Sequence, residues 1–116
     1  MLEGSCHCGC IAFDVEGQPV EAFECNCTYC SRRGLLLWFV PRDQFHLRTP
    51  EEAMSSYRFN RHVIDHRFCP QCGVQAFAFG QDSKTGGAVV AVNVRCLEGV
   101  DLAAIERKPF DGRHRL

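Results

Sequence analysis

The feature that most constrains this chain is its cysteine content, nine among 116 residues. They form three tight groups and a singleton: Cys6, Cys8 and Cys10; Cys25, Cys27 and Cys30; Cys69 and Cys72; and Cys96. The first residues contain neither a basic stretch nor an apolar segment, so we expect no secretory signal and a cytoplasmic location. Because cytosolic thiols are kept reduced, a disulfide framework is not expected, and metal binding becomes the leading explanation.

The composition is that of one globular domain, which we assign to residues 1–116. Hydrophobic residues make up 46% and charged residues 23%, which argues against a disordered chain. The net charge of −1 provides no basic field for nucleic acid or for an anionic membrane surface. No apolar run approaches the roughly 20 residues that cross a bilayer. We therefore expect a single domain that binds neither nucleic acid nor a membrane.

Short apolar runs separated by Gly and Pro predict a mainly β fold with at most one or two short helical turns. Leu35–Val40 is apolar throughout, as in a strand buried on both faces, and Ala88–Val94 follows a Gly-Gly turn. Thr28–Arg33 and Asp101–Ile105 are the two helical candidates. The other expected strands are Ile11–Val15, Val20–Glu24, Phe45–Arg48, Ser56–Phe59, Val63–Phe68 and Gln75–Phe79. This pattern is typical of a sandwich, a barrel or a bent sheet.

The strongest single motif is Cys69-Pro70-Gln71-Cys72-Gly73. Two residues between the thiolates let one tight turn direct both sulfurs at the same metal, and a glycine suits the conformation that such turns need. Cys6-His7-Cys8 can supply two more ligands if the chain bends there, which Gly9 makes easy. Zinc prefers four soft ligands in a tetrahedron, and closed sites of this kind are structural. We predict that a structural zinc, on which folding depends, is bound by Cys6, Cys8, Cys69 and Cys72.

The motif Cys25-Asn26-Cys27-Thr28-Tyr29-Cys30 differs because it places three thiolates on one short turn. Three protein ligands with an open fourth position are the arrangement of a catalytic zinc, and a thiol entering that position would ionise. Spacing alone leaves two alternatives open: a closed structural site completed by a histidine or by Cys96, and iron–sulfur ligation. Our interpretation is a second, catalytic zinc, giving two ions per chain, with the ligands Cys25, Cys27 and Cys30.

The remaining candidates are polar residues and spare thiols. Asn93 and Arg95 alternate along one expected strand and so share a face, where they could bind a substrate carboxylate; a surface ion pair is the alternative. His66 lies close to the third cysteine group, and we interpret it as a hydrogen-bonded strand histidine rather than as an acid–base group. Cys10 and Cys96 are expected to be packed thiols outside the metal sites.

The cysteine motifs, in this order, resemble those of the glutathione-dependent formaldehyde-activating enzyme family, which includes the centromere protein V domain. They are Gly4-Ser5-Cys6-His7-Cys8-Gly9, Cys25-Asn26-Cys27-Thr28-Tyr29-Cys30 and Phe68-Cys69-Pro70-Gln71-Cys72-Gly73. Two later segments also resemble the C-terminal pattern of this family: Val92-Asn93-Val94-Arg95-Cys96-Leu97-Glu98-Gly99-Val100-Asp101 and Phe110-Asp111-Gly112. The resemblance extends over nearly the whole chain and is therefore specific.

The resemblance implies a mainly β fold of bent antiparallel sheets, of the Mss4-like or β-tent type. It also implies the same division into a structural four-cysteine zinc site and a catalytic three-cysteine site. The activity of the family is formation of S-hydroxymethylglutathione from formaldehyde and glutathione, a carbon–sulfur lyase reaction in the reverse sense. We therefore expect a zinc-dependent carbon–sulfur lyase-type enzyme whose partner is a small thiol such as glutathione, together with an aldehyde such as formaldehyde. The alternative is a non-catalytic, zinc-stabilised binding module on the same fold, and a homodimer is left open.

Overall fold

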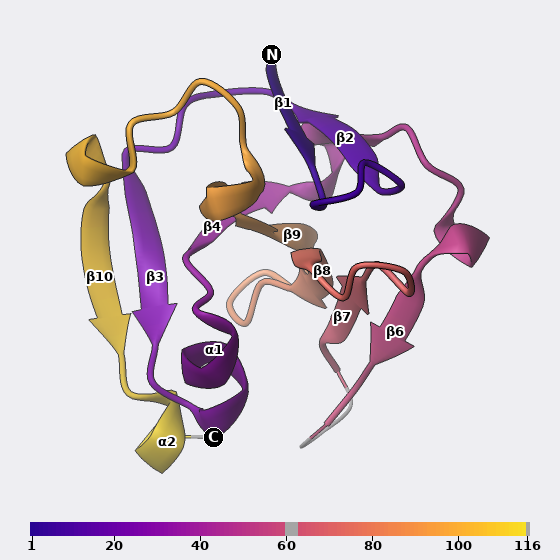
Figure 1. Ribbon diagram of the computed structural model, residues 1–116. Helices are drawn as coiled ribbons and strands as arrows, with labels where there is room; N and C mark the ends of the chain where they lie inside the picture. The colour runs from indigo at the N-terminus through magenta and orange to yellow at the C-terminus, as the bar shows by residue number, and fades with distance from the viewer. Residues whose placement is uncertain (60–62, 116) are drawn as a thin grey trace.

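The computed structural model describes residues 1–59 and 63–115, and it is built from two β-sheets (Figure 1). The small sheet has the order β1-β2-β5 and consists of β1 (Leu2–Ser5), β2 (Ala12–Val15) and β5 (Phe45–Leu47). The large sheet has the order β10-β3-β4-β9-β8-β7-β6. Its strands are β10 (Glu106–Phe110), β3 (Glu21–Cys25), β4 (Leu37–Pro41), β9 (Ala88–Asn93), β8 (Gln75–Gln81), β7 (Asp65–Phe68) and β6 (Ser55–Tyr57). The predicted mainly β fold is confirmed.

Helical structure is short throughout the described residues. The α-helices are α1 (Thr28–Arg33) and α2 (Gly112–Arg115). Single 3₁₀ turns cover Arg42–Gln44, Glu51–Ala53, Val94–Cys96 and Leu102–Ala104. The last of these is the predicted helical candidate near the C-terminus, and the Asp101 carboxylate caps it by accepting a hydrogen bond from the Ala103 N–H. None of these helices combines the length and the apolar character that crossing a membrane requires.

Every expected strand is present, with ends that differ from the expectation by at most two residues. Two strands were not expected. One is β1, and the other is β10, whose polar sequence Glu-Arg-Lys-Pro-Phe shows no apolar alternation. Such a sequence is tolerated because β10 lies at the edge of the large sheet, where proline and charged side chains are common. β10 pairs in parallel with β3, so the large sheet is mixed rather than wholly antiparallel.

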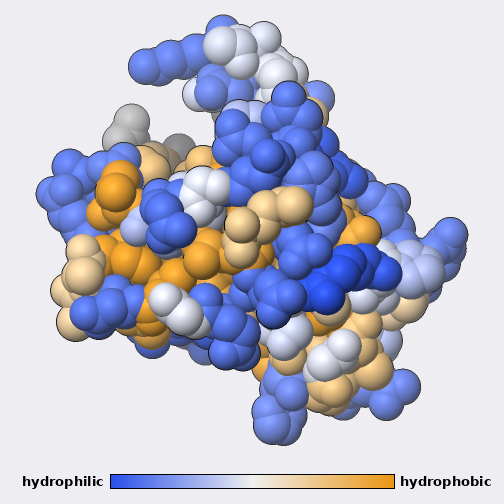
Figure 2. Space-filling model, turned by 90° about the horizontal axis from the view of Figure 1, so that it is seen from above, coloured by the Kyte–Doolittle hydropathy of each residue, from blue (hydrophilic) through white to orange (hydrophobic). Residues whose placement is uncertain are grey.

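Burial of the expected Leu35–Val40 strand is only partly as predicted. Leu35, Leu36 and Val40 are buried, but 49% of Phe39 is exposed, so one face of β4 is open at this point. Phe39 packs against Phe23 of β3 with the ring centroids 5.5 Å apart. Seen from above, hydrophobic side chains gather in one broad area of the surface bordered by hydrophilic ones (Figure 2).

The main core lies between the small sheet and one face of the large sheet. Phe13 of β2, Phe45 of β5 and Phe77 of β8 form its centre, with ring centroids 4.8 to 5.9 Å apart. Phe13 and Phe77 are fully buried. The ring of Phe13 lies directly over Gly4 of β1, where a Cβ atom would come within 2.3 Å of the Phe13 ring. This close approach explains why the strand before the first cysteine motif carries a glycine.

We expect Gly4→Ala to destabilise the fold by about 1–3 kcal/mol, the usual cost of overpacking a core, because the buried Phe13 ring has no free space to move into. Urea unfolding of both proteins measures the difference. Gly80→Ala in β8 is the matched control, since a Cβ there would meet its neighbours only at 3.9 and 4.0 Å. Equal losses for the two variants would contradict the steric explanation.

Candidate metal centres

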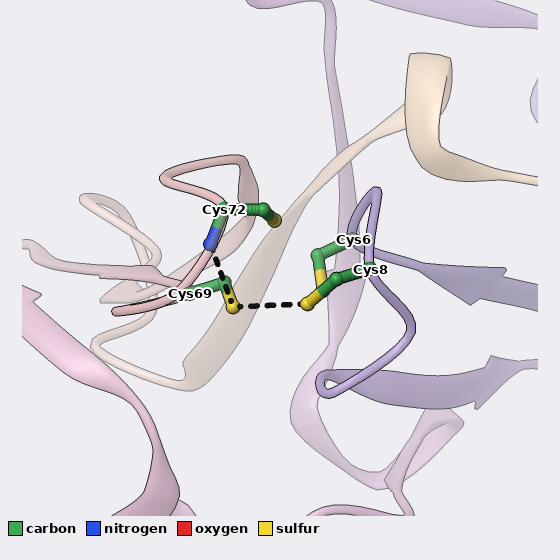
Figure 3. Close-up of side chains that lie close together, drawn as sticks. All are labelled: Cys6, Cys8, Cys69 and Cys72. Atoms are coloured by element: carbon green, nitrogen blue, oxygen red, sulfur yellow. Dashed lines mark hydrogen bonds between the residues drawn. The ribbon is translucent and has the colours of Figure 1, made fainter.

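The fold brings the first and third cysteine motifs together. Cys6 and Cys8 lie on the turn between β1 and β2, and Cys69 and Cys72 lie on the turn between β7 and β8. The four side chains point toward a common centre (Figure 3), and their sulfurs all lie within 4.8 Å of one another. The Sγ atoms of Cys6 and Cys8 are 3.7 Å apart, and those of Cys8 and Cys69 are 3.6 Å apart. The predicted grouping of these residues is therefore confirmed.

Backbone N–H groups are directed at these sulfurs. The Ile11 N–H donates to Cys6 Sγ at 3.3 Å, and the Gln71 and Cys72 N–H groups each donate to Cys69 Sγ at 3.4 Å. Backbone hydrogen bonds from Val74 and Cys8 lower the pKa of the Cys72 thiol to about 6. Donors of this kind favour the anionic form of sulfur, which is the form that binds a metal.

The four sulfurs fit a zinc ion. With zinc–sulfur bonds of about 2.3 Å, tetrahedral geometry places neighbouring sulfurs about 3.8 Å apart, close to the two distances given above. Both turns contain a glycine at positive φ, Gly9 at 84° and Gly73 at 79°, which lets the backbone fold around the sulfurs. The bend that a Cys-x-Cys motif requires is thus present.

The second motif forms a separate group of three sulfurs within 4.8 Å of one another. Cys25 is the last residue of β3, Cys27 is the N-cap of α1, and Cys30 lies in the middle of α1. The Cys27 sulfur accepts a hydrogen bond from the Cys30 N–H at 3.3 Å. Cys27 and Cys30 are each 7% exposed and pack on Leu35, Leu37, Ala78 and Ala91. One turn of α1 therefore holds the cluster against a layer of apolar side chains.

The three thiols of this cluster do not ionise independently. Burial and the neighbouring charges of Cys25 and Cys27 raise the pKa of Cys30 well above its usual range. For Cys27, burial acts in the same direction, but hydrogen bonds from the backbone of Cys30 and from Cys25 outweigh it and lower the pKa. Three thiolates this close repel one another, so a cation is needed to hold all three in the anionic form. The donor set fits a thiophilic metal such as zinc.

The C-terminal segment holds the turn between Cys25 and Cys27. Asn26 donates a hydrogen bond from Nδ2 to Asp111 at 3.0 Å, and its Oδ1 accepts one from the Arg113 N–H at 2.9 Å. The Asn26 N–H donates to the Phe110 carbonyl at 3.1 Å. Figure 1 shows α2 beside the start of α1, at the lower left of the view. The Phe110-Asp111-Gly112 segment thus contacts the three-cysteine turn directly.

Comparison with known proteins identifies the family. The family model described as glutathione-dependent formaldehyde-activating enzyme matches residues 1–109. The chain belongs to the glutathione-dependent formaldehyde-activating enzyme family. The match includes all three cysteine motifs, which confirms the resemblance found in the sequence.

A solved structure supports the fold of this family member. It is the crystal structure of a Rhodobacter sphaeroides protein, which is 27% identical in sequence and superimposes with a TM-score of 0.75. The similarity covers 91% of this chain and 99% of that chain. The two proteins therefore share the fold over nearly their whole lengths.

The expected placement of Asn93 and Arg95 is wrong. β9 ends at Asn93, and Arg95 lies in the following 3₁₀ turn, so the two side chains do not share a face. Asn93 is 6% exposed and caps this turn by accepting a hydrogen bond from the Arg95 N–H at 3.2 Å. Arg95 is exposed, and its Nε donates to the carbonyl of Gly34, the C-cap of α1, at 3.0 Å. An N-cap asparagine before a tight turn explains the change of direction.

His66 is a buried strand histidine, as predicted. It lies in β7 and is 4% exposed, and its Nδ1 accepts a hydrogen bond from Gln75 at 3.1 Å. Burial, together with the charge of Arg33, lowers its pKa to about 4, so the ring is neutral at physiological pH. Gln75 and Tyr29, which belong to the same hydrogen-bonded group, were not expected at this site from the sequence. Tyr29 lies within the Cys27–Cys30 motif, but its partner is 46 residues away and no spacing signal connects them.

Of the two spare thiols, Cys10 differs from the expectation and Cys96 agrees with it. Cys10 is exposed rather than packed, because it lies on the turn before β2 and not within the strand. Cys96 is partly buried against the main core, and burial raises its pKa to about 11. Cys96 packs against the core cluster that contains Cys6 and Cys69 of the four-cysteine site. It is not among the sulfurs of the three-cysteine group.

Proposed function

We propose that this protein is a zinc-dependent carbon–sulfur lyase-type enzyme that joins a small thiol to an aldehyde such as formaldehyde. The observation that carries the proposal is the unequal size of the two clusters. Cys6, Cys8, Cys69 and Cys72 make a complete tetrahedral ligand set, whereas the other cluster has three thiols. In the part of the chain that the structure describes, no fourth Cys, His, Asp or Glu joins that group. A three-ligand site leaves one position for a substrate.

The chemistry assigned to the three-cysteine site is activation of a thiol. A zinc ion at this site would supply a lowered pKa for the thiol of the substrate. In the reaction the substrate sulfur bonds to the aldehyde carbon, the π bond of the carbonyl opens, and the proton lost by the thiol ends on the carbonyl oxygen. Cys25, Cys27 and Cys30 would hold the ion. The apolar side chains that pack on Cys27 and Cys30 would limit the access of water to the reacting sulfur. The four-cysteine site would be structural in this scheme.

An open groove of about 370 Å³ lies along α1, and the arginines that line it suit a negatively charged substrate. It is lined by Thr28, Tyr29, Arg32, Arg33, Ser56, Tyr57 and Phe68. The Arg33 guanidinium lies over two of the rings, 4.8 Å from the Tyr29 centroid and 5.5 Å from that of Phe68.

The arginines around the end of α1 differ from most others in the molecule. Arg42, Arg48, Arg58, Arg67 and Arg107 each form an ion pair, whereas Arg32, Arg33 and Arg95 form none with the residues that the structure describes. A guanidinium without a carboxylate partner, held between aromatic rings, is a suitable receptor for a substrate carboxylate. We therefore include Arg33 and Arg95 among the proposed substrate contacts. Asn93, being buried, would act on the substrate only through Arg95.

The experiment that tests this function measures adduct formation directly. Zinc-loaded protein is mixed with glutathione and formaldehyde, and formation of S-hydroxymethylglutathione is followed by NMR against the spontaneous reaction. Acceleration that disappears when zinc is removed supports the proposal. A protein that holds two zinc ions but accelerates the reaction of no thiol would support the non-catalytic binding module.

Removal of the Arg33 charge is expected to weaken the preference of the protein for a negatively charged thiol substrate. Because a charge-assisted contact contributes about 1.5–3 kcal/mol, Arg33→Gln should raise KM for glutathione by roughly tenfold or more. KM for an uncharged thiol such as 2-mercaptoethanol should stay the same. The matched control is Arg48→Gln, which removes an exposed arginine that pairs with Asp14 on the small sheet. Equal effects on the charged and uncharged thiols would contradict a carboxylate contact.

A further inference from the structure

Tyr29 is the residue between Cys27 and Cys30 that faces the large sheet. Its ring packs on Tyr57 with centroids 5.5 Å apart and planes 10° from parallel, and on Phe59 at 5.0 Å. The His66 ring lies 4.3 Å away. Aromatic contacts at these distances fix the position of a ring. The turn that carries two of the three cysteines thus packs on β6, on β7 and on Phe59.

The hydroxyl of Tyr29 starts a chain of hydrogen bonds that leads to the buried residues Gln75 and His66. It donates to Oε1 of Gln75, and Nε2 of Gln75 donates to Nδ1 of His66 at 3.1 Å. Gln75 and His66 are 3% and 4% exposed. Because the amide nitrogen can only donate, the His66 Nδ1 must accept, and the ring carries its proton on Nε2. Each atom in this series of hydrogen bonds can therefore act only as a donor or only as an acceptor, which fixes the orientation of the neighbouring side chain.

Gln75 is itself held at the start of β8, next to the four-cysteine site. Its carbonyl accepts hydrogen bonds from Asn93 Nδ2 at 3.0 Å and from the Cys96 thiol at 3.8 Å. It directly follows the turn that begins at Cys69 and closes through the Cys69 N–H and the Val74 carbonyl, 3.1 Å apart. The Gln75 side chain thus links the end of the Cys69–Cys72 turn to the middle of the Cys25–Cys30 turn.

We propose that Tyr29, Gln75 and His66 are positioning residues that hold the three-cysteine turn in its metal-binding geometry, with Gln75 as the connection to the four-cysteine turn. The inference rests on the proposed function insofar as that function places a metal at Cys25, Cys27 and Cys30. The three residues act through the backbone of α1 and not as metal ligands. Partners of this kind, one step beyond the ligands, typically change metal affinity by 10- to 100-fold when they are removed.

The test compares two variants that each remove one phenol hydroxyl from the same stack of rings. Tyr29→Phe keeps the ring but leaves the Gln75 Oε1 atom without its donor. Tyr57→Phe removes a hydroxyl from a ring that is 47% exposed and lies outside the hydrogen-bond chain. Release of zinc from the full-length protein to a coloured chelator is followed for both. We expect Tyr29→Phe to speed the faster phase of release at least tenfold and to leave the slower phase unchanged, and Tyr57→Phe to change neither.

A second measurement distinguishes positioning from general loosening. The protein is loaded with Co²⁺, whose absorption reports thiolate geometry, and Tyr29→Phe should alter only the part of the spectrum that Cys27→Ser removes. Equal acceleration of both release phases, no difference from Tyr57→Phe, or a wild-type protein that binds a single metal would each overturn the inference. If Tyr29→Phe alters zinc release but the wild type turns over no thiol, the proposed function is wrong and this inference stands. If the wild type turns over a thiol but Tyr29→Phe releases zinc at the wild-type rate, this inference is wrong and the proposed function stands.

Discussion

Cys69→Ser is expected to abolish cooperative folding. Cys69 is fully buried, accepts two backbone N–H groups at its sulfur, and lies 3.6 Å from the sulfur of Cys8, 61 residues earlier in the chain. The four sulfurs join the β1–β2 turn to the β7–β8 turn. Structural zinc contributes apparent binding free energies of about 10–16 kcal/mol in zinc-finger peptides, as much as the total stability of a typical domain, about 5–15 kcal/mol. Loss of one ligand can therefore exceed the stability that the fold has available.

The measurement is thermal unfolding followed by circular dichroism, together with the zinc content of the purified protein. Cys10→Ser is the matched control, because Cys10 lies in the same N-terminal motif but is exposed and outside the sulfur group. It should unfold as the wild type does. A Cys69→Ser protein with a wild-type melting temperature would show that the four-cysteine site is not structural.

Cys27→Ser is expected to remove turnover and one zinc ion while the domain stays folded. Serine is among the best N-cap residues, so its hydroxyl can replace the Cys27 sulfur as acceptor of the Cys30 N–H and preserve α1. It is, however, a poor ligand for a thiophilic metal. We expect the rate of adduct formation to fall more than about 100-fold, since losing a ligand should cost more than losing a partner one step beyond it.

Three readings on the same sample decide this second prediction: zinc per chain, melting temperature and rate. The zinc content should fall from two to one, and the melting temperature should stay close to that of the wild type. If Cys27→Ser unfolds as completely as Cys69→Ser, the three-cysteine site is structural and its catalytic assignment fails. If turnover persists with one zinc, the reaction takes place elsewhere.

The sequence alone predicts the local parts of this molecule well. Metal-binding turns have short-range signatures, because two thiolates that bind an ion from the same turn lie two or three residues apart, with a glycine where the backbone turns sharply. The Cys69–Cys72 motif and the Cys25–Cys30 motif were grouped correctly for this reason. Strands with strong apolar patterns, such as β9, were also placed correctly.

Features that depend on neighbours distant in the sequence were missed or misplaced. β10 becomes a strand only because β3 provides a partner at the sheet edge. Asn93 and Arg95 separate because a 3₁₀ turn begins where β9 ends. Arg95 then reaches α1, which lies about 60 residues earlier in the chain.

What the sequence by itself determined is therefore the family, the mainly β class and the grouping of seven cysteines into sets of four and three. Ligand spacing and strand patterning are local properties, and they can be recognised before the chain folds. Only the tertiary structure decided that Tyr29, Gln75 and His66 meet between the two sets, and that Arg32 and Arg33, which form no ion pair with the described residues, line a groove along α1. The contact of Tyr29 with Gln75 joins residues 46 positions apart, and packing of α1 on the large sheet creates it.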